Sequence, residues 1–235
     1  YSDTDVDGRK SMNTISMQKS HITEYEVIVL DMDGTLYYQK PFRIRMAAWL
    51  IGHLLRHPTS YKELLTIRMY RKVRENWEQY ESTKQYPDSM SLDERQYQYV
   101  ADRQKSTASK VESAVRFYML EQPLKLLRPY RDEVLAGMIK DWKAQKKKII
   151  IYSDYPVEDK LKALDIEADA CFCATDEEIN CMKPDPKGLR FIQDKLGCPV
   201  QDMIMIGDRY EKDAMAAIAN GMDYIILDTN RKKRK

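Results

Sequence analysis

Long apolar segments are missing from this sequence, and so is a strong excess of either charge. No stretch of the 235 residues approaches the roughly 18 apolar residues of a membrane-spanning helix, and no signal-peptide pattern opens the chain. Lys plus Arg number 39 against 37 Asp plus Glu, which gives a formal net charge of +2. So small an excess makes no general case for nucleic-acid binding. We therefore expect a cytoplasmic protein with neither membrane nor nucleic-acid partners.

Cysteine is scarce, and its positions exclude the usual cysteine-rich architectures. All four cysteines lie in the last third of the chain, which does not look like a disulfide framework. No CxxC pair offers the spacing of zinc ligands. In the segment ADACFCAT, the alternation of cysteine with other residues predicts a short strand instead. We expect core or surface thiols at Cys171, Cys173, Cys181 and Cys198.

Both ends of the chain lack apolar periodicity. Residues 1–23 are polar, do not begin with Met and predict a flexible leader. Residues 231–235, RKKRK, form a basic tail. We interpret this run as a solvated tail. The alternative is a patch that contacts an anionic surface in a longer parent chain.

Apolar runs of strand length alternate with helical patterns along the sequence. The first run, Val27–Leu30, is continuous and largely β-branched, which suits a strand buried on both faces. Later strand patterns occupy 147–154, 171–175, 203–208 and 224–228, and helical patterns occupy 132–145, 156–166, 186–197 and 211–220. This alternation predicts an α/β fold, with a Rossmann-like parallel sheet and helices on both faces, formed by residues 24–38 and 128–230.

Residues 39–127 interrupt this alternation and are too many for an ordinary loop. Apolar residues recur at helical spacing in 44–55, 61–77 and 111–118, so the segment predicts an inserted α-helical cap of about four helices. Because the insertion leaves the chain just after Asp31 and Asp33, we expect it to cover these acids. On its first helix the apolar face comprises Ile44, Ala47, Ala48, Ile51, Leu54 and Leu55.

Polar residues follow several of the predicted strands. Asp31 and Asp33 come directly after the first strand, where a lone buried charge would be costly. In an open parallel sheet, ligands bind outside the carboxyl ends of the strands. Polar side chains from four separated segments are therefore expected to converge there. Besides the first two acids, these are Ser153, Lys183, Asp208 and Asp213.

The residue types indicate the chemistry. Several carboxylates together raise one another's pKa unless a cation lies among them, and hard oxygen ligands of this kind suit Mg²⁺. With Mg²⁺ bound, Lys183 and the Ser153 hydroxyl would stabilise the oxygens of a phosphoryl group. A carboxylate also serves as the nucleophile in aspartyl-phosphate enzymes. The pattern thus indicates Mg²⁺ as cofactor and a small phosphorylated substrate.

Four segments, DMDGTLY, IIIYSD, KPDP and GDRYEKD, occur in this order along the chain. They resemble the four motifs of the haloacid dehalogenase superfamily. The resemblance covers roughly residues 24–31 and 128–228, while the insertion matches only the position and helical character of the superfamily's C1 cap. It implies a phosphatase-type hydrolase, similar to phosphoglycolate phosphatase or β-phosphoglucomutase.

The resemblance also implies a role for each polar residue. Asp31 would attack phosphorus to form a phosphoaspartate, and Asp33 would protonate the leaving oxygen and later activate water. Ser153 and Lys183 would bind the phosphoryl group, while Gly34 would shape the turn after the acids. The metal ligands would be Asp31, the backbone carbonyl of Asp33, Asp208 and, directly or through water, Asp213.

Plainer roles remain open for individual residues. Asp33 could cap its turn, and Asp213 could be an acid in the first turn of a helix, where the dipole favours it. Ser153 could be a strand-end hydroxyl, and Lys183 taken alone resembles a surface lysine. Asp154, where many relatives have Asn, departs from the family pattern and has no assigned role.

The expected function is Mg²⁺-dependent hydrolysis of a phosphomonoester through a phosphoaspartate. Haloalkanoate dehalogenases share the fold but need neither a metal nor an acid at the position of Asp33. A phosphomutase of the β-phosphoglucomutase type keeps every core residue, and a catalytically silent binding or regulatory module is the alternative outside the enzymes. The sequence does not specify the substrate: phosphoglycolate, a sugar phosphate or a nucleotide would each fit.

Overall fold

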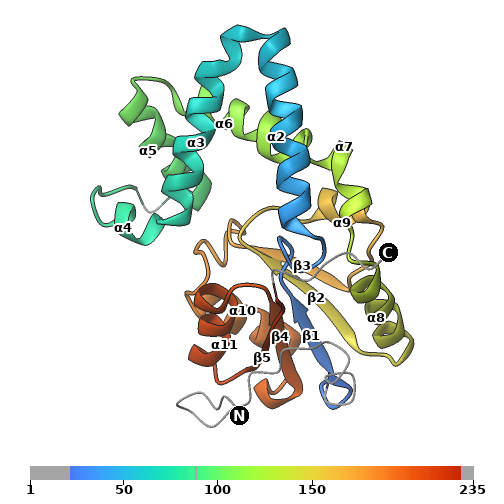
Figure 1. Cartoon of the computed structure of the whole chain (residues 1–235). Helices are drawn as coiled ribbons and strands as arrows, with labels where there is room; N and C mark the ends of the chain where they lie inside the picture. Colours follow the sequence, from blue (N-terminus) through green and yellow to red (C-terminus); the bar gives the residue numbers. More distant parts are fainter. Residues whose placement is uncertain (1–21, 88, 229–235) are drawn as a thin grey trace, which may run out of the picture. The chain divides into compact units, whose positions relative to one another are not determined.

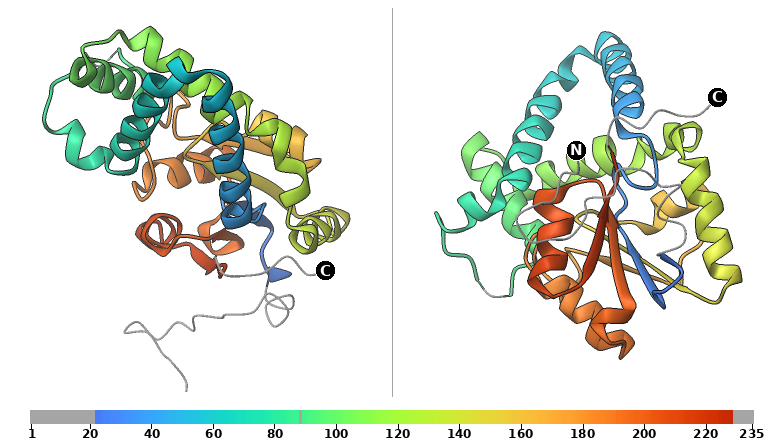
Figure 2. Two further views of the ribbon diagram at one scale, coloured as in Figure 1. Left: turned by 45° about the horizontal axis from the view of Figure 1, so that its top comes forward. Right: turned by 60° about the horizontal axis from the view of Figure 1, so that its bottom comes forward.

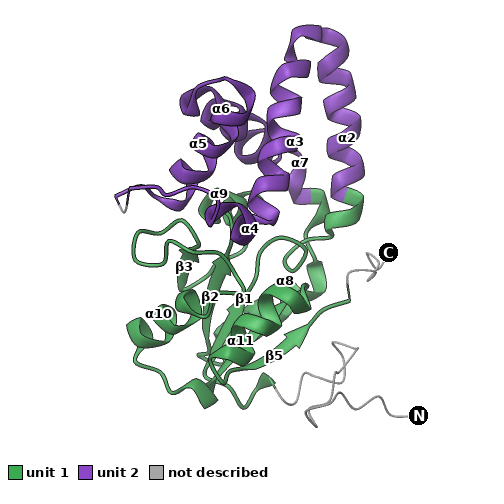
Figure 3. Cartoon of the chain, turned by 90° about the vertical axis from the view of Figure 1, so that its left-hand side faces the viewer, with its two compact units in different colours: residues 1–41, 129–235 green, residues 42–128 purple. Residues whose placement is uncertain are grey.

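The computed structural model describes residues 22–87 and 89–228. The chain forms two compact units, which Figure 3 distinguishes by colour: residues 1–41 with 129–235, and residues 42–128. The predicted insertion, 39–127, differs from the second unit by a few residues at its start and one at its end. Whether it covers the acidic pair stays a prediction.

The first unit is built on a parallel sheet of five strands in the order β3-β2-β1-β4-β5. Helices connect successive strands, so the predicted α/β, Rossmann-like sheet is confirmed. The strands are β1 (Val27–Leu30), β2 (Lys148–Ser153), β3 (Ala170–Cys173), β4 (Met203–Gly207) and β5 (Asp223–Ile226).

The central strands are apolar because both of their faces are covered. All four residues of β1 are buried, as are all five of β4. Leu30 at the end of β1 is in register with Ile151 of β2 and with Ile206 of β4. These three strands therefore end at nearly the same level, and the residues that follow them meet at one edge of the sheet.

Helices lie on both sides of the sheet. One core cluster joins Val29 of β1 and Tyr152 of β2 to Ile192 and Ala216 of two helices. Figures 1 and 2 show α10 and α11 on one side and α8 on the other. The helices of this unit are α8 (Glu133–Ala144), α9 (Glu158–Leu164), α10 (Lys187–Leu196) and α11 (Met215–Ala219), with a π-helical turn η5 (Tyr210–Ala214) and 3-10 turns η3 (Arg128–Tyr130) and η4 (Val200–Asp202).

The helix ends follow local sequence signals. The Asp132 side chain caps α8 by accepting hydrogen bonds from the backbone N–H groups of Val134 and Leu135. Gly197 ends α10 with φ of +59°, a conformation that residues other than glycine adopt with strain. Helix α10 thus ends where the predicted helical pattern 186–197 ends.

The regular structure described in the second unit consists of helices. It has more segments than the four helices expected, because short helices and a π-helical turn separate the longer ones. Its segments are α2 (Gln39–Arg56), η1 (Pro58–Ser60), α3 (Tyr61–Glu75), α4 (Trp77–Glu81), α5 (Leu92–Gln104), α6 (Ala108–Val115), η2 (Arg116–Glu121) and α7 (Leu124–Leu127). Among the described residues, no helix has the length and apolar character needed to cross a bilayer.

The face of α2 that the sequence pattern marks as apolar is exposed rather than packed. Ile44, Ile51 and Leu55 are 73%, 63% and 79% exposed. The packing side of α2 carries its aromatic residues instead: the rings of Trp49 and His53 lie 6.3 and 5.8 Å from the ring of Phe117, measured between centroids. Both sides of α2 carry apolar residues, and the side that the periodicity predicted to be buried is the exposed one.

Helix α5 lies in a polar stretch whose pattern did not predict it. It starts at a capping box, in which the Ser91 hydroxyl accepts from the Glu94 N–H and the Glu94 carboxylate accepts from the Ser91 N–H. Buried polar contacts attach it to α3. The Arg74 guanidinium, 1% exposed, donates to Asp93 Oδ1 and to Gln96 Oε1, both at 2.6 Å.

Candidate active site

The predicted site residues of the sheet lie where β1, β2 and β4 end. Asp31 follows β1, Ser153 is the last residue of β2 and Asp208 follows β4. The backbone N–H of Asp31 donates to the carbonyl of Ile206 at 2.9 Å, which continues the pairing of β1 with β4 beyond the last strand residue. Residues far apart in the sequence are thereby held at one edge of the sheet.

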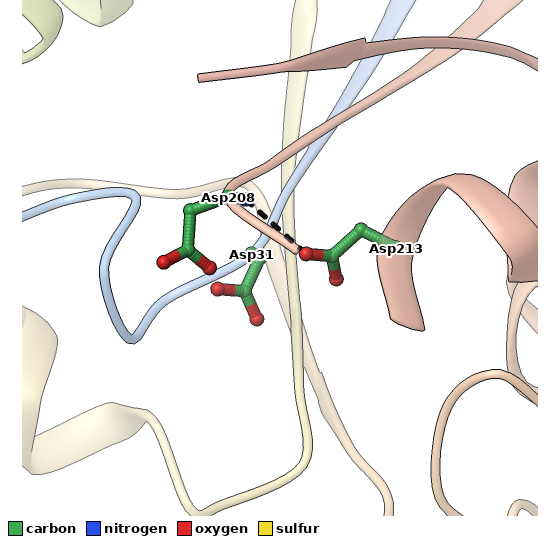
Figure 4. A group of neighbouring side chains, drawn as sticks. All are labelled: Asp31, Asp208 and Asp213. Carbon is green, nitrogen blue, oxygen red and sulfur yellow. Dashed lines mark hydrogen bonds between the residues drawn. The ribbon is translucent and has the colours of Figure 1, made fainter. Parts of the chain in front are cut away.

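Three carboxylates meet at this edge. One oxygen each of Asp31, Asp208 and Asp213 lies within 4.8 Å of the other two. Figure 4 shows Asp31 at the end of β1, Asp208 in the loop after β4 and Asp213 on the following helical turn. The Asp213 Oδ2 accepts from the backbone N–H groups of Asp208 and Arg209, at 3.2 and 3.1 Å. Asp213 therefore fixes the loop that carries Asp208.

Gly34 makes room for this arrangement. Its φ is +98°, and a Cβ placed on it would lie only 2.0 Å from Asp208 Oδ2. The turn after β1 is closed by hydrogen bonds from the N–H groups of Thr35 and Leu36 to the carbonyl of Met32, at 3.3 and 3.0 Å. A side chain at this point of the turn would displace the Asp208 carboxylate.

Lys183 is buried among the acids. The lysine is 2% exposed, and its Nζ donates to Asp31 Oδ1 at 2.7 Å and to Asp213 Oδ1 at 2.5 Å. Its backbone N–H donates to Asp154 Oδ1 at 3.0 Å. Burial opposes its charge, but Asp213, Asp31 and Asp154 outweigh that effect and hold the pKa of Lys183 well above its usual value. Asp154, which the motifs left unexplained, thus anchors the lysine loop.

The carboxyl of Asp31 has a pKa well above its usual range. Burial is the main cause; the nearby ammonium of Lys183 lowers the pKa, and the charges of Asp213 and Asp208 raise it again. Thr35 Oγ1 donates to Asp31 Oδ2 at 3.3 Å. Burial thus keeps the pKa of Asp31 raised in spite of Lys183, whereas the nearby carboxylates keep the pKa of Lys183 raised in spite of burial.

A divalent cation fits this donor set. Three carboxylates and one ammonium carry a formal excess of two negative charges, which a dication would neutralise, and carboxylate oxygens are the ligands that Mg²⁺ prefers. Asp31, Asp208 and Asp213 could each offer an oxygen to the ion. Both oxygens of Asp31 and both of Asp213 already accept hydrogen bonds, with Lys183 a donor to each carboxylate.

Asp33 lies apart from the cluster of three acids and has its own lysine. The Lys160 Nζ, on α9, lies 2.7 Å from both carboxylate oxygens of Asp33, and the Tyr37 hydroxyl donates to Oδ1 at 2.6 Å. Burial raises the pKa of Asp33, but the charge of Lys160 and the hydrogen bonds from Lys160 and Tyr37 outweigh it, so the net shift is downward. Each acid of the DMD motif therefore contacts a different lysine.

Sequence reasoning did not find Lys160. It lies in the segment PVEDKLKAL together with Lys162, and both have the spacing of solvated helix residues. Only the placement of α9 in the fold brings one of them to Asp33. Ser153, the other predicted phosphate-binding residue, is 1% exposed, and its Oγ accepts from the Tyr155 N–H at 3.2 Å.

Comparison with known proteins identifies the family. The family model described as haloacid dehalogenase-like hydrolase matches residues 25–221. The chain belongs to this family. No curated protein matches the sequence.

Solved structures of haloacid dehalogenase-like proteins share the fold. The 2-haloacid dehalogenase from Pseudomonas syringae pv. Tomato DC3000 is 13% identical over 89% of each chain, with a TM-score of 0.59. The Bacillus subtilis protein YfnB, described as a HAD-hydrolase bound to magnesium, is 14% identical over 89% of this chain and 91% of its own, with a TM-score of 0.59. A Thermotoga maritima protein described as a β-phosphoglucomutase is 16% identical over 89% of this chain and 88% of its own, with a TM-score of 0.50.

These likenesses establish the fold but not the reaction, because the identities are low and the named activities differ. Membership of the family makes the chain a haloacid dehalogenase-like hydrolase. Dehalogenases, a phosphatase and a phosphomutase are all among the names of its structural neighbours. The choice among them rests on the residues of this site.

Proposed function

We propose that this protein is a Mg²⁺-dependent phosphomonoester hydrolase that works through a phosphoaspartate on Asp31. The observation that carries the proposal is the cluster of Asp31, Asp208 and Asp213, with Lys183 bonded to the first and third. A second acid, Asp33, stands two residues after Asp31. Such a set suits an anionic substrate with a cation. The substrate class is a small phosphorylated metabolite.

Asp31 is the nucleophile of the proposed reaction. Its Oδ1 accepts from Lys183 and its Oδ2 from Thr35, so the carboxylate is held in one orientation before substrate arrives. An oxygen of Asp31 attacks phosphorus, the bond from phosphorus to the leaving oxygen breaks, and the phosphoryl group is transferred to the carboxylate. Lys183 and Ser153 stabilise the phosphoryl oxygens during this transfer.

Asp33 moves the proton. Because its pKa is lowered, Asp33 starts as a carboxylate, and the proton that it donates enters with the monoanion of the phosphomonoester. Asp33 passes this proton to the leaving oxygen. In the second half of the reaction Asp33 takes a proton from the water that attacks phosphorus, and the bond between phosphorus and Asp31 breaks. That proton leaves with inorganic phosphate, so Asp31 and Asp33 both return to carboxylates.

When bound, Mg²⁺ would supply positive charge that neutralises the carboxylates and the phosphoryl oxygens. Asp31 and Asp208 would hold it, with the backbone carbonyl of Asp33. Asp213 supports the ion by fixing Lys183 and the Asp208 loop.

The same residues favour phosphoryl transfer over dehalogenation. Displacement of a halide by a carboxylate needs neither a second acid to protonate the leaving group nor a cluster of acids for a cation. Asp31 would be the nucleophile in either reaction, but Asp33 and the two further acids, Asp208 and Asp213, have no purpose in dehalogenation. A phosphomutase would use the same core, and the fate of the phosphoryl group separates it: a hydrolase releases inorganic phosphate in equal amount to the dephosphorylated product.

Phosphate release from a generic aryl phosphate and from a panel of phosphorylated metabolites tests the proposal. We expect turnover with Mg²⁺, none with excess chelator, and none for Asp31→Asn. The matched control is Asp159→Asn, an exposed acid of the same type that pairs with Lys162 at 3.1 Å, and it should keep wild-type activity. Full turnover in chelator would refute the proposal. So would isomerised sugar phosphate without phosphate release, or halide release from a haloacid with no phosphatase activity.

A further inference from the structure

The contacts of Asp33 distinguish its two oxygens. Oδ1 accepts from both Lys160 and Tyr37, at 2.7 and 2.6 Å, whereas Oδ2 accepts from Lys160 alone, at 2.7 Å. An ammonium that contacts both oxygens lies near the bisector of the carboxylate and opposes its rotation. Oδ2 is therefore the oxygen with more remaining capacity to accept or donate a proton.

Lys160 is held by packing on a rigid element. Its helix, α9, is anchored by Val157, Leu161 and Leu164, which are 0%, 6% and 0% exposed. Its Nζ also lies 5.4 Å from the centre of the Tyr155 ring, over the ring face. The Lys160 side chain is 12% exposed, in contrast with 78% for Lys162 two residues later on the same helix. The pair of Lys160 with Asp33 is thus partly desolvated, unlike the exposed pair of Lys162 with Asp159 on the same helix.

Tyr37 is fixed from a different direction. It is 4% exposed and follows the turn after β1, where its backbone forms a bridge with Arg131. Asp33 is consequently held between two elements, the segment that leaves β1 and the helix that follows β2. A carboxylate oriented in this way is preorganised for one direction of proton transfer.

We propose that Lys160 is a positioning residue that, with Tyr37, fixes the Asp33 carboxylate so that its Oδ2 faces the leaving oxygen of the substrate. This inference rests on the proposed phosphomonoester hydrolysis and adds to it a residue outside the four motifs. Lys160 acts through Asp33 and does not bind the phosphoryl group. Its removal therefore lowers the rate of proton transfer and leaves the affinity for the phosphoryl group unchanged.

The test compares leaving groups. An alkyl phosphate needs protonation of its leaving oxygen, whereas a nitrophenyl phosphate leaves as a stable anion. General acid and base catalysis accelerates a reaction by about 10² to 10⁴. We expect Lys160→Met to lose part of this acceleration, so that kcat on the alkyl substrate falls by about tenfold or more. On the aryl substrate the loss should be no more than about threefold, with KM unchanged for both. Lys160→Arg should restore part of the loss, and Lys162→Met, the control on α9, should match wild type.

A double variant shows whether Lys160 acts through Asp33. In the Asp33→Asn background, Lys160→Met should cause no further loss on the alkyl substrate. If Lys160→Met fails to fold by circular dichroism, Tyr37→Phe, which removes one hydroxyl, should give a smaller loss with the same preference for the alkyl substrate.

Two results would overturn the inference while the proposed function survives. In one, Lys160→Met, or Tyr37→Phe in its place, lowers kcat equally for both substrates. In the other, Lys160→Met lowers the Asp33→Asn variant by the same factor as wild type. An inactive wild-type protein on both phosphates with Mg²⁺ would instead refute the proposed function and this inference with it.

Discussion

Substitution of Gly34 by alanine should abolish the site while leaving the fold intact. Two effects act at this position. The φ of +98° is strained for any residue with a Cβ, and the new Cβ would lie 2.0 Å from Asp208 Oδ2. The second effect is specific to the site, because the atom that must move is a proposed metal ligand.

The magnitude follows from the geometry. Left-handed backbone costs a residue with a Cβ about 1–2 kcal/mol. An ordinary contact would place the two atoms at least 3.4 Å apart, so starting from 2.0 Å the carboxylate must retreat by more than about 1 Å. Misplacement on this scale costs on the order of 10²-fold in rate. Gly34→Ala should therefore lose about 100-fold in kcat/KM and most of its Mg²⁺ affinity.

Gly197→Ala is the matched control. Gly197 also has a positive φ, +59°, but nothing lies within 4 Å of the position of its Cβ. Backbone strain should lower the free energy of unfolding of Gly197→Ala by about 1–2 kcal/mol. Its kcat/KM and its Mg²⁺ affinity should equal those of the wild-type protein. Urea denaturation, steady-state kinetics and calorimetric Mg²⁺ titration of both variants supply the data. Equal activity and equal Mg²⁺ affinity in the two variants would refute the argument about Asp208.

Three further outcomes follow from the structure. Mg²⁺ at 100 times its Kd should stabilise the wild-type protein by about 2.7 kcal/mol, measured by chemical denaturation, and Asp208→Asn should lose that gain; an equal gain in both would place the ion elsewhere. Gly137→Ala, at an exposed helix position with nothing within 4 Å of the new Cβ, should raise stability by about 0.5–1 kcal/mol, and a loss would contradict the geometry of α8. Because the proton enters with the substrate monoanion, kcat/KM for alkyl phosphates should fall as pH rises above about 6, the second pKa of a phosphate ester, and a flat profile from pH 6 to 8 would exclude that route.

The sheet and its polar edge could be predicted from sequence because their signals are local. The run Val27–Leu30 is apolar throughout since both faces of β1 are buried, and a strand of this kind needs no knowledge of its neighbours. Polar residues that directly follow such strands must lie at the carboxyl edge of a parallel sheet. Asp31 and Asp208 were placed by that rule, and the structure brings them together with Asp213.

The helical unit and the Asp33 contacts depend on packing that the sequence does not specify. Helix α2 has two apolar sides, and only contacts such as Trp49 with Phe117, 6.3 Å between ring centroids, decide which one is covered. For the same reason, Lys160 and Lys162 cannot be told apart by pattern. They lie about 160° apart around the helix axis, and the placement of α9 directs only Lys160 to Asp33.

The central claim is that Asp31 carries the phosphoryl group between the leaving group and water. The protein is mixed rapidly with Mg²⁺ and an aryl phosphate and quenched with acid. Mass spectrometry of its peptides, kept at acid pH so that the adduct survives, then measures this directly. The account predicts a phosphoryl adduct on the peptide that contains Asp31, formed before inorganic phosphate appears and lost as it is released. Phosphate release with no adduct at Asp31, or with the adduct on another residue, would contradict it.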